Sequence, residues 1–145
     1  MNYLQIIHED VCNGNGLRVS LWVSGCSHCC LNCHNPETWD KASGIPFDEY
    51  TKKEIFDDLS QDYIDGITIT GGDPLFESNL NEVLQLIKEI RHLFPNKTIW
   101  LYTGYSWESI MNYKSCSSDD FDYIEESYND ELYEIRKEII SLCDI

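Results

Sequence analysis

Apolar residues recur along the chain with two periods, one typical of strands and one typical of helices. Residues 17–24 alternate in character and are rich in β-prone side chains, which predicts a strand. Residues 79–94 instead place leucine, isoleucine and valine at helical spacing and end before Pro95. Over the whole chain, these criteria predict strands at residues 17–24, 66–70 and 98–102 and helices at residues 48–59, 79–94, 107–113 and 132–142.

The order of these elements determines the expected fold class. Strands that alternate with helices form βα units, which build an α/β fold with a largely parallel sheet. We expect Asn79 and Glu82 to form a capping box at the start of a helix, and the acidic residues 117–129 to form a surface loop. The loop after residue 24 and the turns 71–74 and 103–105 each follow a predicted strand. They should therefore share the sheet edge at which α/β proteins bind ligands.

Length and charge narrow the class of protein. A chain of 145 residues fits a single domain over residues 1–145. It has no apolar run of about eighteen residues and no basic, apolar signal segment at its start, so we expect a soluble, cytoplasmic protein without a membrane partner. The 26 acidic and 10 basic side chains give a formal net charge of −16. Such a chain repels phosphate backbones, and we expect no nucleic-acid partner.

The cysteines carry the strongest chemical signal. The chain has seven, an odd number that excludes a complete set of internal disulfides, and four of them fall within residues 26–33. Cys26, Cys30 and Cys33 form a C-x₃-C-x₂-C pattern. Thiolates hold iron–sulfur clusters, and a four-iron cubane normally takes four protein ligands. Three local cysteines leave one iron open, and an open coordination position is what binding of a substrate to a metal requires.

The same segment allows other interpretations. Cys29 permits a division into two C-x₂-C pairs, so a structural zinc site could use all four cysteines, or three of them with His28 or His34. A redox C-x₂-C switch is a further alternative, although the pattern does not open a helix as in thioredoxin-like units. We expect His28 to shape the loop rather than bind metal. Outside the segment, we expect Arg18 to form a salt bridge with a carboxylate.

Four motifs together resemble a known family. These are residues 25–39 (GCSHCCLNCHNPETW), 66–75 (GITITGGDPL), 99–107 (IWLYTGYSW) and 13–18 (NGNGLR). Their order and spacing over roughly residues 1–110 resemble the anaerobic ribonucleotide reductase activating proteins, which are small members of the radical S-adenosylmethionine superfamily.

The resemblance implies a fold, two cofactors and a set of site residues. The fold would be a partial (β/α) barrel of the radical S-adenosylmethionine type, without its last strand because the chain stops at residues 143–145, where that strand begins. The cofactors would be one [4Fe-4S] cluster and one S-adenosylmethionine, with no catalytic residue beyond the cluster ligands. The implied cluster ligands are Cys26, Cys30 and Cys33, so we expect Cys29 to be incidental. The implied S-adenosylmethionine contacts are Asn32, Cys33, His34, Gly71, Gly72 and Asp73. The Asp73 carboxylate would add charge assistance toward the methionyl amino group.

The resemblance also implies an activity. The protein would be a radical S-adenosylmethionine oxidoreductase that takes an electron from an external donor such as a flavodoxin. It would cleave S-adenosylmethionine to a 5′-deoxyadenosyl radical and generate a glycyl radical on the large subunit of anaerobic ribonucleotide reductase. The alternatives are activation of another glycyl radical enzyme, another radical S-adenosylmethionine reaction, and a non-catalytic zinc module for protein interaction.

Overall fold

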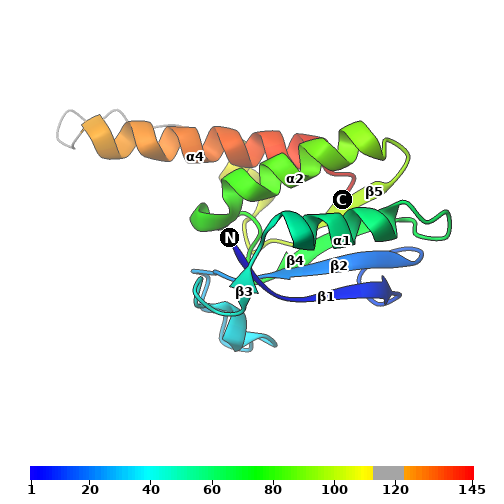
Figure 1. The fold of residues 1–145 in the computed structure, drawn as a ribbon. Helices are drawn as coiled ribbons and strands as arrows, with labels where there is room; N and C mark the ends of the chain where they lie inside the picture. Colours follow the sequence, from blue (N-terminus) through cyan, green and yellow to red (C-terminus); the bar gives the residue numbers. More distant parts are fainter. Residues whose placement is uncertain (113–122) are drawn as a thin grey trace.

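The computed structural model describes residues 1–112 and 123–145, with the side chains of residues 1–112 and 130–145. The chain forms a mixed α/β structure in which one sheet is covered by helices (Figure 1). Of the loop predicted at residues 117–129, the first part lies outside the described residues.

The sheet has five strands in the order β3-β1-β2-β4-β5. Their bounds are β1 Asn2–Asp10, β2 Arg18–Val23, β3 Ile45–Pro46, β4 Gly66–Gly71 and β5 Thr98–Leu101. The three predicted strands correspond to β2, β4 and β5, which pair in parallel as expected. The sequence analysis missed β1 and β3, which add two antiparallel pairings on the other side of β2.

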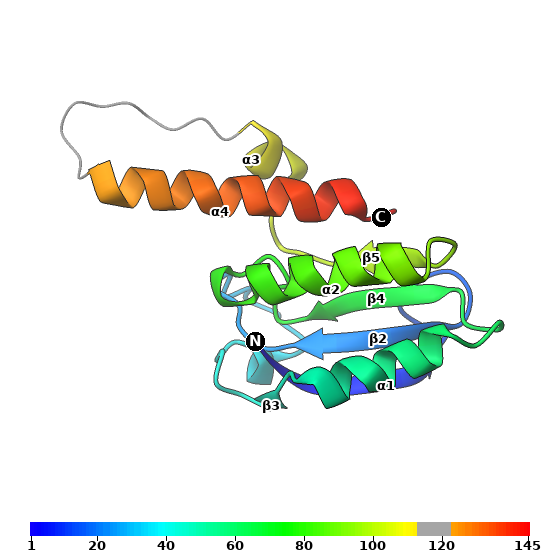
Figure 2. The ribbon, with the colours of Figure 1, turned by 45° about the horizontal axis from the view of Figure 1, so that its top comes forward.

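The helices are α1 Glu49–Leu59, α2 Leu80–Leu93, α3 Trp107–Met111 and α4 Tyr123–Leu142, with short 3₁₀ helices at Pro36–Thr38 and Glu77–Asn79. Figures 1 and 2 show α1 and α2 on the same face of the sheet and α4 alongside α2. The expected loop is wrong for residues 123–129, which belong to α4. That stretch lacks Gly and Pro and is rich in Glu, a good helix former, although few of its side chains are apolar.

The two faces of the sheet differ in polarity because successive side chains of a strand point to opposite sides. The side chains that form the core with the helices are apolar and almost fully buried; they include Val19, Leu21, Ile67, Ile69 and Ile99. The alternate positions of the same strands carry Arg18, Ser20, Thr68 and Thr98. The parallel strands therefore have one aliphatic face and one mainly polar face, on which Trp22 and Trp100 also lie.

Arg18 lies on the polar face and is only 1% exposed. Its guanidinium donates hydrogen bonds to the hydroxyls of Thr68 and Thr98, both at 2.8 Å. It also donates to the carbonyls of Asn15, Ile67 and Thr98, at 3.2, 2.7 and 3.1 Å. The expected salt bridge is wrong: in the described part of the chain no carboxylate oxygen lies within 4.0 Å of this group. Uncharged hydroxyl and carbonyl oxygens accept the hydrogen bonds of the guanidinium instead.

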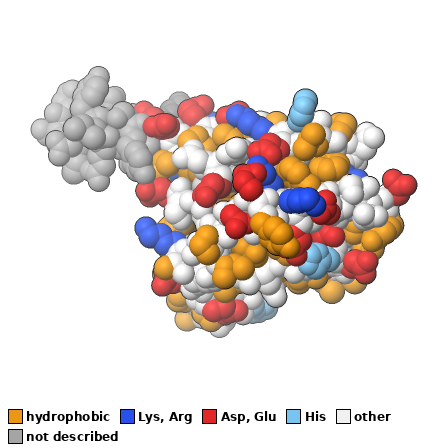
Figure 3. Space-filling view, in the orientation of Figure 1, with side chains coloured by type: hydrophobic (Ala, Val, Ile, Leu, Met, Phe, Trp, Pro, Cys, Tyr) orange, Lys and Arg blue, Asp and Glu red, His pale blue; other side chains and the backbone are white. Residues whose placement is uncertain are grey.

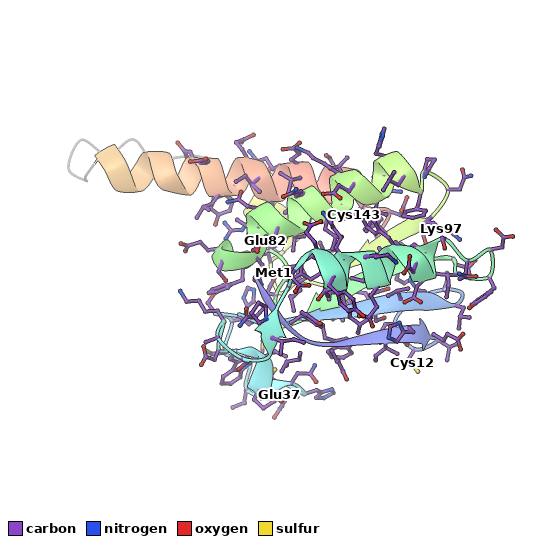
Figure 4. The ribbon with its side chains drawn as sticks, in the orientation of Figure 1. Met1, Cys12, Glu37, Glu82, Lys97 and Cys143 are labelled. Atoms are coloured by element: carbon purple, nitrogen blue, oxygen red, sulfur yellow. The ribbon has the colours of Figure 1, made fainter. Side chains whose placement is uncertain are left out.

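The helix starts differ in how they are capped. Asp48 caps α1 and accepts a hydrogen bond from the backbone N–H of Thr51 at 2.8 Å. The capping box expected at Asn79 and Glu82 is wrong, because the Asn79 side chain makes no cap hydrogen bond. Glu82 instead forms an ion pair with the amino group of Met1, toward which it points in Figure 4.

The last two residues lie along the free side of β5. Asp144 N–H donates to the carbonyl of Ile99 at 2.8 Å, and Leu101 N–H donates to the carbonyl of Ile145 at 2.8 Å. These hydrogen bonds attach Asp144 and Ile145 to β5, while the described sheet keeps its five strands. The sheet edge at β5 is therefore partly covered by the residues that follow α4.

The surface carries mixed side chains. On the face drawn in Figure 3, acidic, basic and hydrophobic side chains are interspersed. None of the helices that the structure describes has the length and apolar character needed to cross a bilayer.

Candidate metal centre

Residues 25–35, which we name the cysteine loop, leave the carboxyl end of β2. Its first two residues are fixed by backbone hydrogen bonds: Gly25 N–H donates to Thr38 at 2.7 Å and Cys26 N–H donates to Trp39 at 3.1 Å. Thr38 and Trp39, which follow the loop in sequence, therefore lie beside its first two residues. The loop projects from the sheet edge with both ends held together.

The four cysteines of the loop are free thiols with different exposure. Cys26 and Cys33 are half-buried, whereas Cys29 and Cys30 are exposed. Cys33 N–H donates to the carbonyl of Cys30 at 3.1 Å, which closes a turn between two of the predicted ligands. Cys29 has a φ of +48°, in the left-handed region that few residues other than glycine adopt. Its backbone therefore reverses the chain between Cys26 and Cys30, a role that sequence reasoning did not foresee.

The surroundings of Cys33 suit a metal-bound thiolate. Its sulfur accepts hydrogen bonds from the indole N–H of Trp39 at 3.3 Å and from the backbone N–H of Asn35 at 3.4 Å. Such N–H···S contacts orient ligands and tune the potential of iron–sulfur clusters. Burial raises the pKa of the Cys26 thiol, so a metal at this position would have to displace the proton. The donor set and its hydrogen bonds fit an iron–sulfur cluster.

The thiols do not converge on one point. In the described ranges 1–112 and 123–145, no three His, Cys, Asp or Glu side chains are close enough together to hold a single metal ion. A zinc site needs its ligands around one ion, whereas the cysteines of a cubane each bind a different iron and surround the cluster. The zinc arrangement considered above is therefore not preformed in this loop.

The turn after β4 contacts the cysteine loop through its backbone. Gly71 has a φ of +104°, and the next two residues donate to β2 and the loop: Gly72 N–H to Val23 and Asp73 N–H to Gly25, both at 2.8 Å. A Cβ atom on Gly72 would lie 2.6 Å from the carbonyl oxygen of Gly25, closer than any side chain allows. Glycine at this position is thus required for the close approach of the turn and the loop.

Asp73 joins three segments of the candidate site. Its side chain is 1% exposed and accepts hydrogen bonds from Thr103 Oγ1 at 2.9 Å and from the N–H groups of Gly104 at 2.9 Å and Leu75 at 2.8 Å. The Nε2 atom of His28, in the cysteine loop, lies 2.7 Å from the same carboxylate. We name Asp73 and these four donors the Asp73 network. It brings the three strand-end segments together, as the sequence predicted, and directs the carboxylate toward the protein's own donors.

Sequence reasoning did not identify every residue of this arrangement. Thr103 had no expected role, yet it binds Asp73 across 30 residues of sequence. Asn79, expected to cap a helix, donates instead to the carbonyls of Ser24 at 2.9 Å and Asp73 at 3.0 Å. The sequence signal for Thr103 was its position just after a strand that ends at this edge, and Asn79 had no comparable signal.

The other predicted contacts of S-adenosylmethionine lie on the outer part of the cysteine loop. Asn32 and His34 are exposed, and Cys33 between them is half-buried. The loop thus presents these residues at the surface, next to the thiols.

A cavity of about 340 Å³ lies beside the turn at residues 103–105. It is enclosed by β5, α3, the end of α4 and the last residues, and its lining consists of Leu101, Thr103, Tyr105, Trp107, Ile110, Ile140, Cys143, Asp144 and Ile145. Burial raises the pKa of the Cys143 thiol to about 12. Figure 4 shows Cys143 among the helices and Cys12 near the end of β1. The Cys143 thiol therefore stays protonated at neutral pH, and it lines this cavity rather than belonging to the cysteine loop.

Comparison with known proteins identifies the family. A family model described as a 4Fe-4S single cluster domain matches residues 12–141. The anaerobic ribonucleoside-triphosphate reductase-activating protein of Enterobacteria phage T4 is 46% identical over 110 residues, which cover 76% of this chain and 70% of that protein. The proteins of the same name from Pasteurella multocida (strain Pm70) and Escherichia coli (strain K12) are 44% and 42% identical, over 73% and 76% of this chain and 68% and 73% of their own lengths.

The cluster-domain match spans most of the chain, and these relatives align over more than two thirds of their length. The chain therefore belongs to the family of anaerobic ribonucleoside-triphosphate reductase-activating proteins.

Proposed function

We propose that this chain is an activating enzyme that cleaves S-adenosylmethionine reductively and generates a glycyl radical on the large subunit of anaerobic ribonucleotide reductase. The observation that carries the proposal is the meeting of the cysteine loop with the Gly71–Asp73 turn at the carboxyl edge of the parallel strands. Family membership supports the same activity, because the relatives are named for activating that reductase.

The proposed cluster ligands are Cys26, Cys30 and Cys33. A four-iron cluster held by three thiolates leaves one iron without a protein ligand, where a small molecule can bind. When bound, the reduced cluster and S-adenosylmethionine supply a 5′-deoxyadenosyl radical that can take a hydrogen atom from a glycine. The chain itself contributes binding and orientation.

The proposed cofactor contacts are Asn32, Cys33 and His34 in the loop and Gly71 and Gly72 in the turn. The glycines let the turn pack closely on β2 and the cysteine loop, so that the backbone of the turn would lie near a ligand held by the loop. Asp73 would favour a positive group near the turn through its charge, although its oxygens already accept hydrogen bonds from the protein.

The proposed fold type is a single radical S-adenosylmethionine domain over residues 1–145, built as a partial (β/α) barrel. The succession β2-α1-β4-α2-β5 supports this proposal, because it repeats a parallel βα unit. We further propose a cytoplasmic enzyme that receives its electron from a flavodoxin or a similar external donor.

Anaerobic reconstitution of the full chain with iron and sulfide tests the proposal. We expect a cluster whose reduced electron paramagnetic resonance spectrum changes when S-adenosylmethionine is added, with release of methionine and 5′-deoxyadenosine. Cys30→Ala should abolish the cleavage and leave the fold intact, whereas Cys12→Ala, at another exposed cysteine remote from the loop, should retain it. Stoichiometric zinc without a spectral response, or cleavage retained by Cys30→Ala, would contradict the proposal.

The partner is tested separately. The reconstituted chain is mixed with the anaerobic reductase large subunit, S-adenosylmethionine and a reductant, and the glycyl radical signal is recorded. A signal on this subunit supports the proposed partner. Cleavage of S-adenosylmethionine without that signal would instead favour activation of another glycyl radical enzyme.

A further inference from the structure

The imidazole of His28 occupies a defined position between the cysteine loop and the turn after β4. His28 lies midway in sequence between Cys26 and Cys30. Its Nε2 atom is 2.7 Å from Oδ2 of Asp73, and its side chain is 23% exposed against 1% for the aspartate. A carboxylate only accepts hydrogen bonds, so the imidazole donates. This contact links the middle of the loop to a buried group of the sheet edge.

The protein encloses this imidazole on two further sides. A Cβ atom on Gly104 would lie 2.5 Å from Cδ2 and 2.7 Å from Nε2 of His28, so the ring packs directly on the glycine backbone. The ring of Tyr105 meets the imidazole edge-on, with 4.7 Å between ring centroids and 76° between planes. The imidazole ring of His28 is therefore closely packed against the Thr103–Tyr105 turn.

Helix α4 contacts the Thr103–Tyr105 turn and stabilises its position. Arg136, 5% exposed, donates to the Tyr105 hydroxyl at 3.2 Å and to the carbonyl of Leu75 at 3.0 Å. Its guanidinium also lies over the Tyr105 ring, 4.6 Å from the centroid. The contacts run without interruption from α4 through Tyr105 to His28 and Asp73.

We infer that His28 is a positioning residue, which docks the cysteine loop on the Asp73 network and sets the place of Cys26 and Cys30 relative to the Gly71–Gly72 turn. The inference rests on the proposed function, in which the loop holds a cluster and the turn receives S-adenosylmethionine. Other hydrogen bonds fix the ends of the loop and Cys33, whereas His28 links the stretch between the first two ligands to the Asp73 network.

Loss of this contact should separate cluster binding from cofactor binding. In His28→Ala the three cysteines remain, so we expect iron and sulfide to be incorporated as in the unsubstituted chain. The loop can then shift relative to the turn, and we expect the Kd for S-adenosylmethionine to rise by about 10- to 100-fold, the factor expected when one hydrogen bond to a charged group is lost. The change of the reduced resonance spectrum on adding S-adenosylmethionine should weaken in parallel.

Two further variants distinguish positioning from a general loss of structure. In His28→Gln the amide nitrogen can reach Asp73 from nearly the same place, so we expect it to restore most of the affinity. Gly104→Ala keeps His28 and the Gly104 N–H but places a methyl group where the imidazole lies, so we expect the defect of His28→Ala. The matched control is His8→Ala, which removes a surface histidine paired with Asp58 at 2.6 Å. It should change neither the Kd for S-adenosylmethionine nor the resonance spectrum.

Hydrogen exchange of the unloaded chain tests the docking without any cofactor. We expect His28→Ala and Gly104→Ala to increase amide exchange within residues 25–35, and His28→Gln and His8→Ala to leave it unchanged. Unchanged exchange in His28→Ala would overturn the inference, and so would an unchanged Kd for S-adenosylmethionine. A wild-type chain that does not respond to S-adenosylmethionine would instead refute the proposed function, and the exchange result alone would then decide whether His28 docks the loop.

Discussion

Arg18 allows a quantitative test of how the polar face of the sheet is held together. Its guanidinium makes five hydrogen bonds, four of them to hydroxyl or carbonyl groups on the parallel strands and one to the carbonyl of Asn15. It also lies 5.1 Å from the centroid of the Trp100 ring. Arg18→Lys keeps the charge but replaces a planar fork with a compact ammonium that has three donors. At least two of the five hydrogen bonds must therefore be lost.

The expected cost follows from these two lost contacts. A hydrogen bond to a charged group contributes about 1.5–3 kcal/mol, and a buried acceptor left without a partner is costly in the same range. Two losses at the lower value lower the free energy of unfolding by about 3 kcal/mol. For a chain of this size, that corresponds to a fall in Tm of roughly 10 °C.

Urea unfolding of the unloaded chain, followed by tryptophan fluorescence and circular dichroism, measures this change. The control is Lys53→Arg on the exposed side of α1, where the side chain is 70% exposed and the substitution should cost less than about 0.5 kcal/mol. If the free energy of unfolding of Arg18→Lys lies within about 1 kcal/mol of that of the unsubstituted chain, the planar geometry of the guanidinium does not matter and the reasoning is wrong.

Three further predictions concern a carboxylate, an indole and two thiols. Burial alone would raise the pKa of Asp10, but the hydrogen bonds it accepts from a hydroxyl, a side-chain amide and a backbone N–H hold the pKa below its usual range. Its stabilising contribution is therefore present at neutral pH and is lost as the pH falls through the range in which this carboxylate takes up a proton. Asp10→Asn should weaken the decrease of the urea midpoint over that acidic range. Trp39→Phe removes an N–H donor to the sulfur of Cys33, so the reduction potential of the reconstituted cluster should become more negative in redox titration, and an unchanged potential would contradict this. At pH 8, iodoacetamide should modify exposed Cys12 and spare Cys143, whose pKa of about 12 leaves it protonated; peptide mapping that finds both modified would refute this.

The elements that the sequence predicted are those whose side chains follow one period without interruption. The strands β2, β4 and β5 were found at nearly their observed bounds, and so were α1 and α2. Strand β1 was missed because its pairing with β2 shifts register between Tyr3 and Gln5 and again between Ile7 and Asp10. Each shift breaks the alternation by which a half-buried strand is recognised.

The candidate site was predictable in its segments but not in its contacts. The spacing of the cysteines and the turns that follow strands placed the loop and Gly71–Asp73 at one edge. The partners of Asp73 could not be predicted, because Thr103 and His28 lie 30 and 45 residues away in sequence and meet it only through the sheet. Arg18 and Asn79 were misassigned for the same reason: local patterns suggest an ion pair and a cap, whereas distant carbonyl groups are the actual acceptors.

The dependence of the cysteine loop on distant partners has a consequence for maturation. Gly25 receives its hydrogen bond from Asp73 only once β2 and β4 have paired, and their paired residues, such as Arg18 and Gly66, are 48 positions apart. Pairings of such long range form late in folding. Small zinc modules fold around their ion, but here the polypeptide must reach its native topology before the thiols are arranged for a ligand. In the cell, iron would then be delivered to a chain that has already folded.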